Sequence, residues 1–132
     1  MTPFDPTSLQ QSWPKPAHPR PIVTFGAGSI VGDAHFPAYK KAGFSVAGLY
    51  DPDHIKARAL ADAWGVTAYT SAEQAAAVEG AVFDLATPPG AHCSVLKSLP
   101  DGAAVLIQKP MGSDLAGATE ILKICRAKNL KA

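Results

Sequence analysis

Residues 22 to 51 contain the feature that most constrains the fold of this chain. An apolar run, Ile22 to Phe25, is followed by a glycine turn, a helical stretch and a second apolar run, Phe44 to Tyr50, which ends at Asp51. Short runs rich in β-branched and aromatic residues and bounded by glycine indicate strands. The order of strand, glycine turn, helix, strand and acid is typical of a dinucleotide-binding unit.

The two glycines of the turn have different predicted tasks. Gly26 allows a tight turn after the strand, and Gly28, which has no Cβ, lets the backbone approach a pyrophosphate at the N-terminus of the next helix. The usual fingerprint has a third glycine at position 31, but this chain has Val31 there and Gly32 one residue later. We therefore expect an intact phosphate site with a slightly different helix entry.

Asp51 lies 23 positions after Gly28, close to where such folds place the acid that binds an adenosine ribose. A helix N-cap is an alternative role for Asp51, but Asp53 fits that role better. A carboxylate would bind the ribose hydroxyls and repel a 2′-phosphate, so the sequence favours NAD. Lys56 and Arg58 keep NADP possible.

The rest of the chain continues the alternation of strand and helix. This alternation predicts an α/β fold, a doubly wound and mainly parallel Rossmann sheet with helices on both faces. Residues 1–20, with Pro3, Pro6, Pro14, Pro16 and Pro19, are expected to form an extended arm before a dinucleotide-binding domain at 21–132. The expected helices after strand one are 29–42, ordered from about His35 because of Pro37, then 54–64, 71–78, 91–99 and a last helix capped by Ser113. The further strands are expected at 66–69, 82–86 and 103–108.

The bulk properties point to a small-molecule partner. The 132-residue chain has a formal charge of +1, which gives no electrostatic footprint for nucleic acid or an anionic membrane. It has no apolar stretch of about 20 residues and no signal-peptide pattern, so a cytoplasmic protein is expected. Cys93 and Cys125 are far apart without clustered histidines, and no metal site is expected.

Polar residues that follow strands four and five should meet the glycine turn at the carboxyl edge of the sheet. Lys109, after strand five, is either a solvated strand-end charge or a group that orients a substrate hydroxyl and stabilises a developing alkoxide. His92 either binds cofactor or substrate, or faces solvent or caps its turn. For His35 we expect a structural hydrogen bond to the loop backbone.

With these residues in place, the chain resembles the N-terminal half of the Gfo/Idh/MocA oxidoreductases over about residues 21 to 131. The resemblance rests on four segments in order, at 26–38, 46–53, 86–92 and 108–111. It implies that the cofactor is held by Gly26, Gly28, Asp51, Thr87, Pro88 and His92, with backbone contacts from Ser29 and Ile30. It also implies that Lys109 lies beside the substrate.

The chain departs from the family pattern in two ways. Gln108 stands where the family usually has glutamate, so Lys109 lacks one possible charge partner. The resemblance implies that complete members have a Rossmann domain joined to a second α/β domain. That second domain supplies most of the substrate pocket, a catalytic histidine and the oligomer interface. We therefore expect this chain to be part of a longer protein that can form a homo-oligomer. The chain alone is expected to bind cofactor and to turn over little or nothing.

The leading hypothesis is the NAD(P)-binding domain of a dehydrogenase that moves hydride between nicotinamide and a sugar, cyclitol or related polyol. The alternative is a non-catalytic dinucleotide-binding sensor or regulatory module, which Gln108 keeps open. A third hypothesis is an S-adenosylmethionine-binding domain. The segments Thr87-Pro88-Pro89 and Lys109-Pro110 argue against it.

Overall fold

The core of the protein is a five-stranded parallel sheet. The computed structural model describes residues 5–8 and 14–132. Its strands are β1 (Ile22–Phe25), β2 (Val46–Tyr50), β3 (Thr67–Ala68), β4 (Val82–Leu85) and β5 (Ala104–Ile107). They are arranged in the order β3-β2-β1-β4-β5, and every pairing is parallel. The chain reverses its direction of travel across the sheet between β3 and β4, which makes the carboxyl ends of β1 and β4 the expected ligand crevice.

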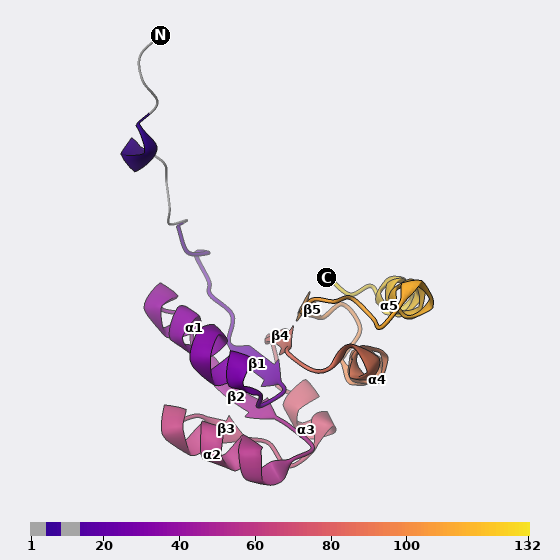
Figure 1. Cartoon of the computed structure of the whole chain (residues 1–132), viewed down its shortest axis with the longest axis horizontal. Helices are drawn as coiled ribbons and strands as arrows, with labels where there is room; N and C mark the ends of the chain where they lie inside the picture. Colours follow the sequence, from indigo (N-terminus) through magenta and orange to yellow (C-terminus); the bar gives the residue numbers. More distant parts are fainter. Residues whose placement is uncertain (1–4, 9–13) are drawn as a thin grey trace.

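Helices cover both faces of the sheet, so the predicted doubly wound α/β fold is confirmed. The helical segments are η1 (Pro6–Ser8), η2 (Val31–His35), α1 (Phe36–Ala42), α2 (His54–Trp64), α3 (Ala72–Ala76), η3 (Pro89–Ala91), α4 (His92–Ser98) and α5 (Leu115–Ala127). Figure 1 shows α1 and α2 on one side of the strands and α4 and α5 on the other. Two hydrophobic clusters correspond to these two layers.

Alternation along the strands assigns side chains to the two clusters. Phe25, Phe83 and Leu85 are buried on the face that α4 and α5 cover, together with Leu96 and Ile121 of these helices. The smaller cluster, on the α1 and α2 face, consists of Val31, Phe36, Leu49, Ala57 and Ala61. Full burial of one large apolar side chain contributes about 1.5 to 3 kcal/mol, so the larger cluster is the main source of stability.

Two of the three predicted helix caps are confirmed, and the third is wrong. Asp53 and Ser71 each accept a hydrogen bond from the backbone N–H three residues later. At the last helix the cap is Asp114, not Ser113: Asp114 Oδ1 accepts from Gly117 N at 2.8 Å. Ser and Asp have similar N-cap preferences, so the packing of the preceding loop decides which residue takes the cap position.

The first helix begins earlier than the position of Pro37 predicts. Helical backbone starts at Ser29 and passes through the π-helical turn η2, in which the N–H of Phe36 donates to Val31 O. A proline has no N–H to donate, and the wide turn just before it removes the regular bonding pattern there. The expected change in helix entry is therefore present as one extra residue in the turn.

The displaced glycine lies within this wide turn. A Cβ at Gly32 would be 3.1 Å from Leu60 Cδ1, so Gly32 permits close packing against α2. The turn at the start of the first helix is thus fitted closely to its neighbour.

The strand β1 is preceded by residues 14–20, which are exposed. Lys15 Nζ donates to Gly43 O at 2.9 Å, and Arg20 donates to Ala81 O at 2.8 Å. These contacts fasten this segment to the domain. The rest of the arm proposed for residues 1–20 includes positions 1–4 and 9–13, which are outside the described residues.

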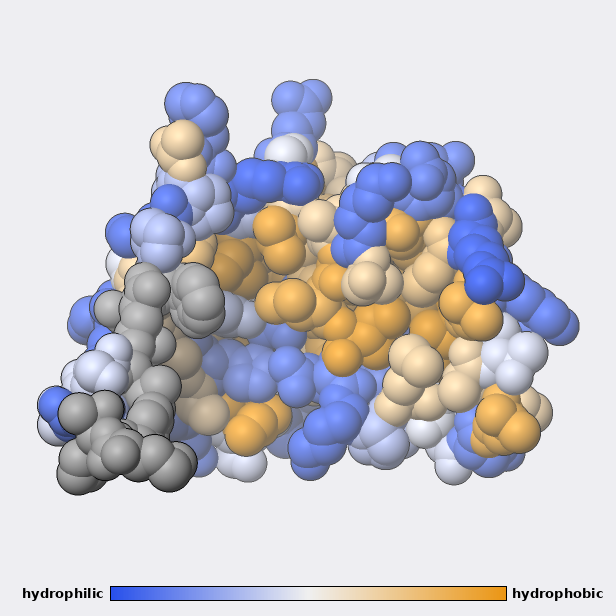
Figure 2. Space-filling model, turned by 90° about the horizontal axis from the view of Figure 1, so that it is seen from above, coloured by the Kyte–Doolittle hydropathy of each residue, from blue (hydrophilic) through white to orange (hydrophobic). Residues whose placement is uncertain are grey.

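One face of the molecule is apolar at its centre (Figure 2). Leu106 of β5 is 48% exposed, and a recess of about 280 Å³ beside it is lined by Ile22, Tyr39, Phe44 and Val82 together with residues 16, 18 and 20. Within the described part of the chain, no helix combines the length and apolarity needed to cross a membrane.

Candidate functional site

A cleft of about 710 Å³ lies at the carboxyl ends of β1, β2 and β4. Its volume is in the range of small-molecule and cofactor sites. Five of the residues predicted from the sequence line it, namely Gly26, Gly28, Asp51, Thr87 and Pro88. Lys56, named from the sequence as a possible contact for NADP, also lines it, whereas the sequence reasoning missed Tyr50, Glu73, Ser94, Val95 and Ser98. Ser94, Val95 and Ser98 share one face of α4, a spacing that could have indicated their common exposure to the cleft.

The glycine turn is tightly held on one side and open on the other. Gly26 has φ +115°, and a Cβ there would be 2.5 Å from Ala86 O, so neither the backbone conformation nor the space admits a side chain. Its N–H donates to Tyr50 O at 2.8 Å. At Gly28, by contrast, a Cβ would meet no atom within 4 Å. This open space beside the backbone suits a ligand that approaches the start of the helix.

Asp51 connects the end of β2 to the glycine turn. Its Oδ2 accepts from Ala27 N and its Oδ1 from Asp53 N, both at 2.8 Å. Each carboxylate oxygen can accept a further hydrogen bond, so the carboxylate is oriented and still able to accept hydrogen bonds from the hydroxyls of a ribose.

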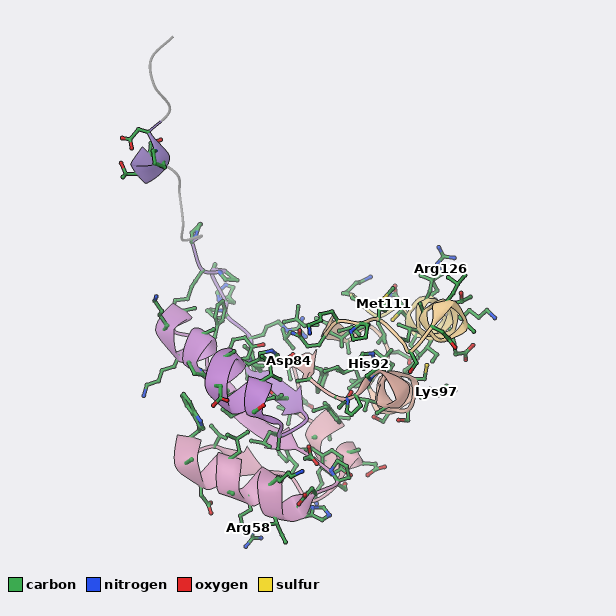
Figure 3. All side chains as sticks on the ribbon, in the orientation of Figure 1. Arg58, Asp84, His92, Lys97, Met111 and Arg126 are labelled. Carbon is green, nitrogen blue, oxygen red and sulfur yellow. The ribbon has the colours of Figure 1, made fainter. Side chains whose placement is uncertain are left out.

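The two basic residues near this acid are placed differently. Lys56 lines the cleft, but its ammonium group lies 3.4 Å from Asp53 Oδ2, and both side chains are largely exposed. A hydrogen bond from the Lys56 backbone holds the pKa of Asp53 below its ordinary value. Arg58 extends away from the sheet on the outer side of α2 (Figure 3) and lines a separate shallow pocket there.

Thr87 and His92 follow β4 and are both enclosed. The Thr87 hydroxyl oxygen is buried and has no hydrogen-bond partner among the described residues. Because buried polar groups are normally paired, an unpaired hydroxyl at the wall of a cleft fits a bound polar ligand. The open space at Gly28, the oriented Asp51 carboxylate and this hydroxyl together fit a dinucleotide.

His92 is fully buried at the start of α4. One of the two roles considered for it from the sequence, a solvent-facing side chain, is therefore wrong. Neither ring nitrogen has a partner among the residues that the structure describes, and His92 is not part of the cleft lining. Its contact with a cofactor stays a prediction. Burial lowers the pKa of the His92 imidazole below its ordinary value, which favours the neutral ring.

This burial makes the stability of the fold depend on pH. Above the unfolded-state pKa of about 6.5, the His92 imidazole is neutral in both the folded and the unfolded state, so its protonation does not affect the free energy of unfolding. As the pH falls below that value, the unfolded chain binds a proton that the folded chain disfavours, so the free energy of unfolding decreases. Thermal unfolding of His92→Gln should show a shallower loss of stability between about pH 7.5 and 5 than the parent. The exposed His18 is the control, and an equal effect of His18→Gln would contradict the assignment.

Lys109 is exposed and follows β5 at the same sheet edge. The preceding residue is anchored, since Gln108 N donates to Leu85 O at 3.2 Å. The loop continues through Gly112, where φ is +78° and a Cβ would be 2.6 Å from Ala118 N, so the loop packs directly on the start of α5. Lys109 does not line the cleft, and neither do Ser29 and Ile30, which are exposed at the start of the first helix.

His35 differs from its prediction. Its Nδ1 lies 2.7 Å from Asp84 Oδ2, a side-chain contact to β4 in place of the expected hydrogen bond to the loop backbone. Asp84 lies on the α1 side of the sheet, and His92 lies on α4 (Figure 3). Sequence spacing could not bring out this contact, because residues 35 and 84 are joined only by the sheet topology.

Comparison with known proteins is consistent with this geometry. A family profile described as "Oxidoreductase family, NAD-binding Rossmann fold" matches residues 21–132. Comparison with curated protein sequences gives no match.

Several solved structures share the fold. A dehydrogenase (MviM) from Clostridium difficile is 24% identical over 84% of this chain and 37% of its own, with a TM-score of 0.72. UDP-N-acetylglucosamine 3-dehydrogenase GnnA from Acidithiobacillus ferrooxidans is 21% identical over 86% and 37%, with a TM-score of 0.71. The WlbA dehydrogenase from Chromobacterium violaceum, in complex with NADH and UDP-GlcNAcA, is 21% identical over 92% and 37%, with a TM-score of 0.74.

The matched region extends over most of this chain but only 37% of the length of these three solved chains. The profile match includes every residue of the cleft, from the glycine turn to the end of α4. The chain therefore belongs to the Gfo/Idh/MocA oxidoreductase family and contains its NAD-binding Rossmann domain.

Proposed function

We propose that the chain is the cofactor-binding part of a dehydrogenase that transfers hydride between nicotinamide and a carbinol carbon of a sugar, cyclitol or related polyol. The observation that supports it most is the convergence of the glycine turn, Asp51 and Thr87 on one cleft, at the sheet edge where Lys109 follows β5. In open parallel sheets this edge is where ligands bind. Of two solved proteins that share the fold, one is described as a UDP-N-acetylglucosamine 3-dehydrogenase. The other is described as a dehydrogenase in complex with NADH and UDP-GlcNAcA.

In this proposal the chain's residues bind and orient. NAD supplies the hydride acceptor when it is bound. The glycine turn admits the pyrophosphate, Asp51 accepts hydrogen bonds from the adenosine ribose, and the Thr87 hydroxyl forms a polar contact near the nicotinamide. The Lys109 ammonium stabilises negative charge that develops on the substrate oxygen. The group that removes the hydroxyl proton is proposed to lie outside these residues, because the related solved chains are much longer.

We favour NAD over NADP as the cofactor. The Asp51 carboxylate lines the cleft, and at the proposed position of the adenosine ribose it would repel a 2′-phosphate. Of the two basic residues that could offset this repulsion, Lys56 is paired with Asp53 and Arg58 extends away from the cleft. Because this exposed ion pair is weak, we expect the preference for NAD to depend mainly on the Asp51 carboxylate and only slightly on the pairing of Lys56.

Calorimetric titration of the chain with NAD, NADP and S-adenosylmethionine tests the proposed site. We expect binding of NAD with one molecule per chain, weaker binding of NADP and none of S-adenosylmethionine. Failure of both nicotinamide dinucleotides to bind would overturn the proposal, and selective binding of S-adenosylmethionine would replace it.

The role of Lys109 has its own test. In Lys109→Ala we expect an unchanged dissociation constant for NAD, because Lys109 does not line the cleft. Reduction of NAD by a polyol or UDP-sugar substrate, measured by NADH absorbance in the protein that carries the activity, should fall by about 10²- to 10³-fold. Lys123→Ala, which removes an exposed lysine of α5, should leave this rate unchanged. A Lys109→Ala variant with the parental rate would assign Lys109 to the solvated surface.

A non-catalytic dinucleotide sensor is the second candidate, and Gln108 is the observation that favours it. The glutamine leaves Lys109 without the charge partner that the family pattern provides. Gln108→Glu should raise the rate of hydride transfer if the chain is part of an enzyme. Tight NAD binding without hydride transfer to any sugar or polyol, in parent and variant alike, would favour the sensor.

A further inference from the structure

Asp84 is a fully buried carboxyl group in the middle of β4. Its neighbours at the same register are Thr24 on β1 and Leu106 on β5. Within the described residues, Asp84 Oδ1 and Thr24 Oγ1 have no hydrogen-bond partner. Burial of a carboxylate is costly, and an apolar residue at this position would avoid that cost. The proposed hydride chemistry makes no use of Asp84, so its presence needs another explanation.

The other oxygen of Asp84 receives two donors from one helical segment. His35 Nδ1 lies 2.7 Å from Oδ2, and the Tyr39 hydroxyl donates to the same atom at 2.8 Å. Burial and the nearby Asp84 charge raise the pKa of Tyr39, so the phenol stays protonated and remains a donor. His35 ends η2 and Tyr39 lies one turn later in α1. Two donors from successive turns on one atom fix both the rotation and the axial position of this segment relative to β4.

The segment that is fixed in this way leads directly from the glycine turn. Only the π-helical turn η2 separates residues 28–30 from His35, and Val31 N donates to Gly28 O at 3.0 Å. On its other side, Gly32 packs closely against Leu60 of α2. A wide turn is an irregular part of a helix, and such turns occur frequently at functional sites. The direction of the first N–H groups, which form the anion site, therefore depends on how η2 and α1 are held.

We propose that Asp84 is a positioning residue for the cofactor and acts through His35 and Tyr39. The buried carboxylate holds η2 and α1 against β4, so that the N–H groups at residues 28–30 are already aimed at the pyrophosphate before it binds. The inference rests on the proposed cofactor site. It assigns a share of the affinity for every ligand that contains the pyrophosphate to three residues that are not part of the cleft lining.

The test compares the affinity of NAD and of ADP-ribose for the parent chain and for Asp84→Asn, His35→Gln and Tyr39→Phe. We expect Asp84→Asn and His35→Gln to weaken both ligands by about tenfold, because both ligands contain the pyrophosphate. Tyr39→Phe should have a smaller effect, since the contact between His35 and Asp84 remains. The double variant of His35→Gln with Asp84→Asn should lose no more than the worse single variant, as for two residues that act as a unit.

A substitution in the hydrophobic core distinguishes an effect on the positioning of the glycine turn from an effect on the stability of the fold. Ile121→Val removes one buried methyl group from the opposite face, so it should lower the Tm without changing either dissociation constant. If the cluster variants lower the Tm but bind NAD like the parent, the cluster is only structural and the proposal is overturned. Should Asp84→Asn not fold, His35→Gln and Tyr39→Phe carry the same comparison, because they leave the carboxylate in place.

Amide hydrogen exchange of the free protein provides a readout that needs no ligand. In His35→Gln the amide of Val31 should exchange faster than in the parent, while Ile121→Val should leave it unchanged. Absence of NAD binding to the parent would overturn the proposed function, and the exchange rates would still decide whether the cluster positions the turn. Equal exchange in His35→Gln and the parent would overturn the positioning role.

Discussion

The Gly26→Ala variant is expected to lose about 2 to 5 kcal/mol of unfolding free energy and, with it, binding of NAD. At φ +115° an alanine is strained, and its methyl carbon would be placed 2.5 Å from Ala86 O, just after the neighbouring strand β4. Relief of that contact requires the turn to shift from its place between β2 and β4, which disturbs the hydrogen bonds from Gly26 N to Tyr50 O and from Ala27 N to Asp51 Oδ2. Urea unfolding and calorimetric titration with NAD measure the two effects.

Gly28→Ala is the matched variant for this prediction. A Cβ at position 28 meets no protein atom within 4 Å, so stability should stay within about 0.5 kcal/mol of the parent. The added methyl group would occupy the space proposed for the pyrophosphate, and the affinity for NAD should fall by about tenfold or more. Parental NAD affinity in Gly28→Ala would place the pyrophosphate elsewhere, and parental stability in Gly26→Ala would contradict the close approach to Ala86.

The second large effect is expected for Asp51→Ala. This change removes the carboxylate that binds Ala27 N and Asp53 N and that is proposed to accept hydrogen bonds from the ribose hydroxyls. Hydrogen bonds to charged groups contribute about 1.5 to 3 kcal/mol, so NAD affinity should fall by about 10- to 100-fold. NADP should lose less, because a repulsive charge is removed at the same time. The ratio of the two dissociation constants, from parallel titrations, is the decisive quantity.

Asp53→Ala controls for the neighbouring negative charge. Asp53 caps α2 and pairs with Lys56, so its loss should cost about 1 kcal/mol of stability. It should leave the preference for NAD over NADP nearly unchanged. If Asp53→Ala shifts this preference as much as Asp51→Ala does, selectivity depends on the local charge as a whole and the specific role of Asp51 is wrong.

Much of the fold could be predicted because the relevant interactions are local. Periodicity predicted all five strands and the order of the helices, and α2 matches its expected bounds with Asp53 and Gly65 at its ends. Caps and turns depend on residues three or four positions apart, which the sequence displays directly. The prediction of Ser113 as the cap of the last helix was wrong, because Asp114, the next residue, has a similar capping preference and only the packing of the loop distinguishes the two.

The site could be predicted only in part. The glycine turn, Asp51, Thr87 and Pro88 were expected at one edge, and the cleft brings these together because the carboxyl ends of parallel strands meet there. The faces of α3 and α4 that complete the cleft, with Glu73 and Ser94 among them, were missed. Their exposure depends on how these helices pack on the sheet, and a single helix pattern does not specify which neighbour leaves a gap.

By itself, the sequence determined the alternation of strands and helices, the conformation demanded at Gly26 and the presence of an acid at the end of β2, since these follow from local backbone chemistry. Only the tertiary structure decided that His35 and Tyr39 meet Asp84, that Thr87 borders the cleft and that His92 is fully buried. The reason is physical: each of these contacts joins residues from different elements, and their distances are set by the order of the strands and the packing of helices on them.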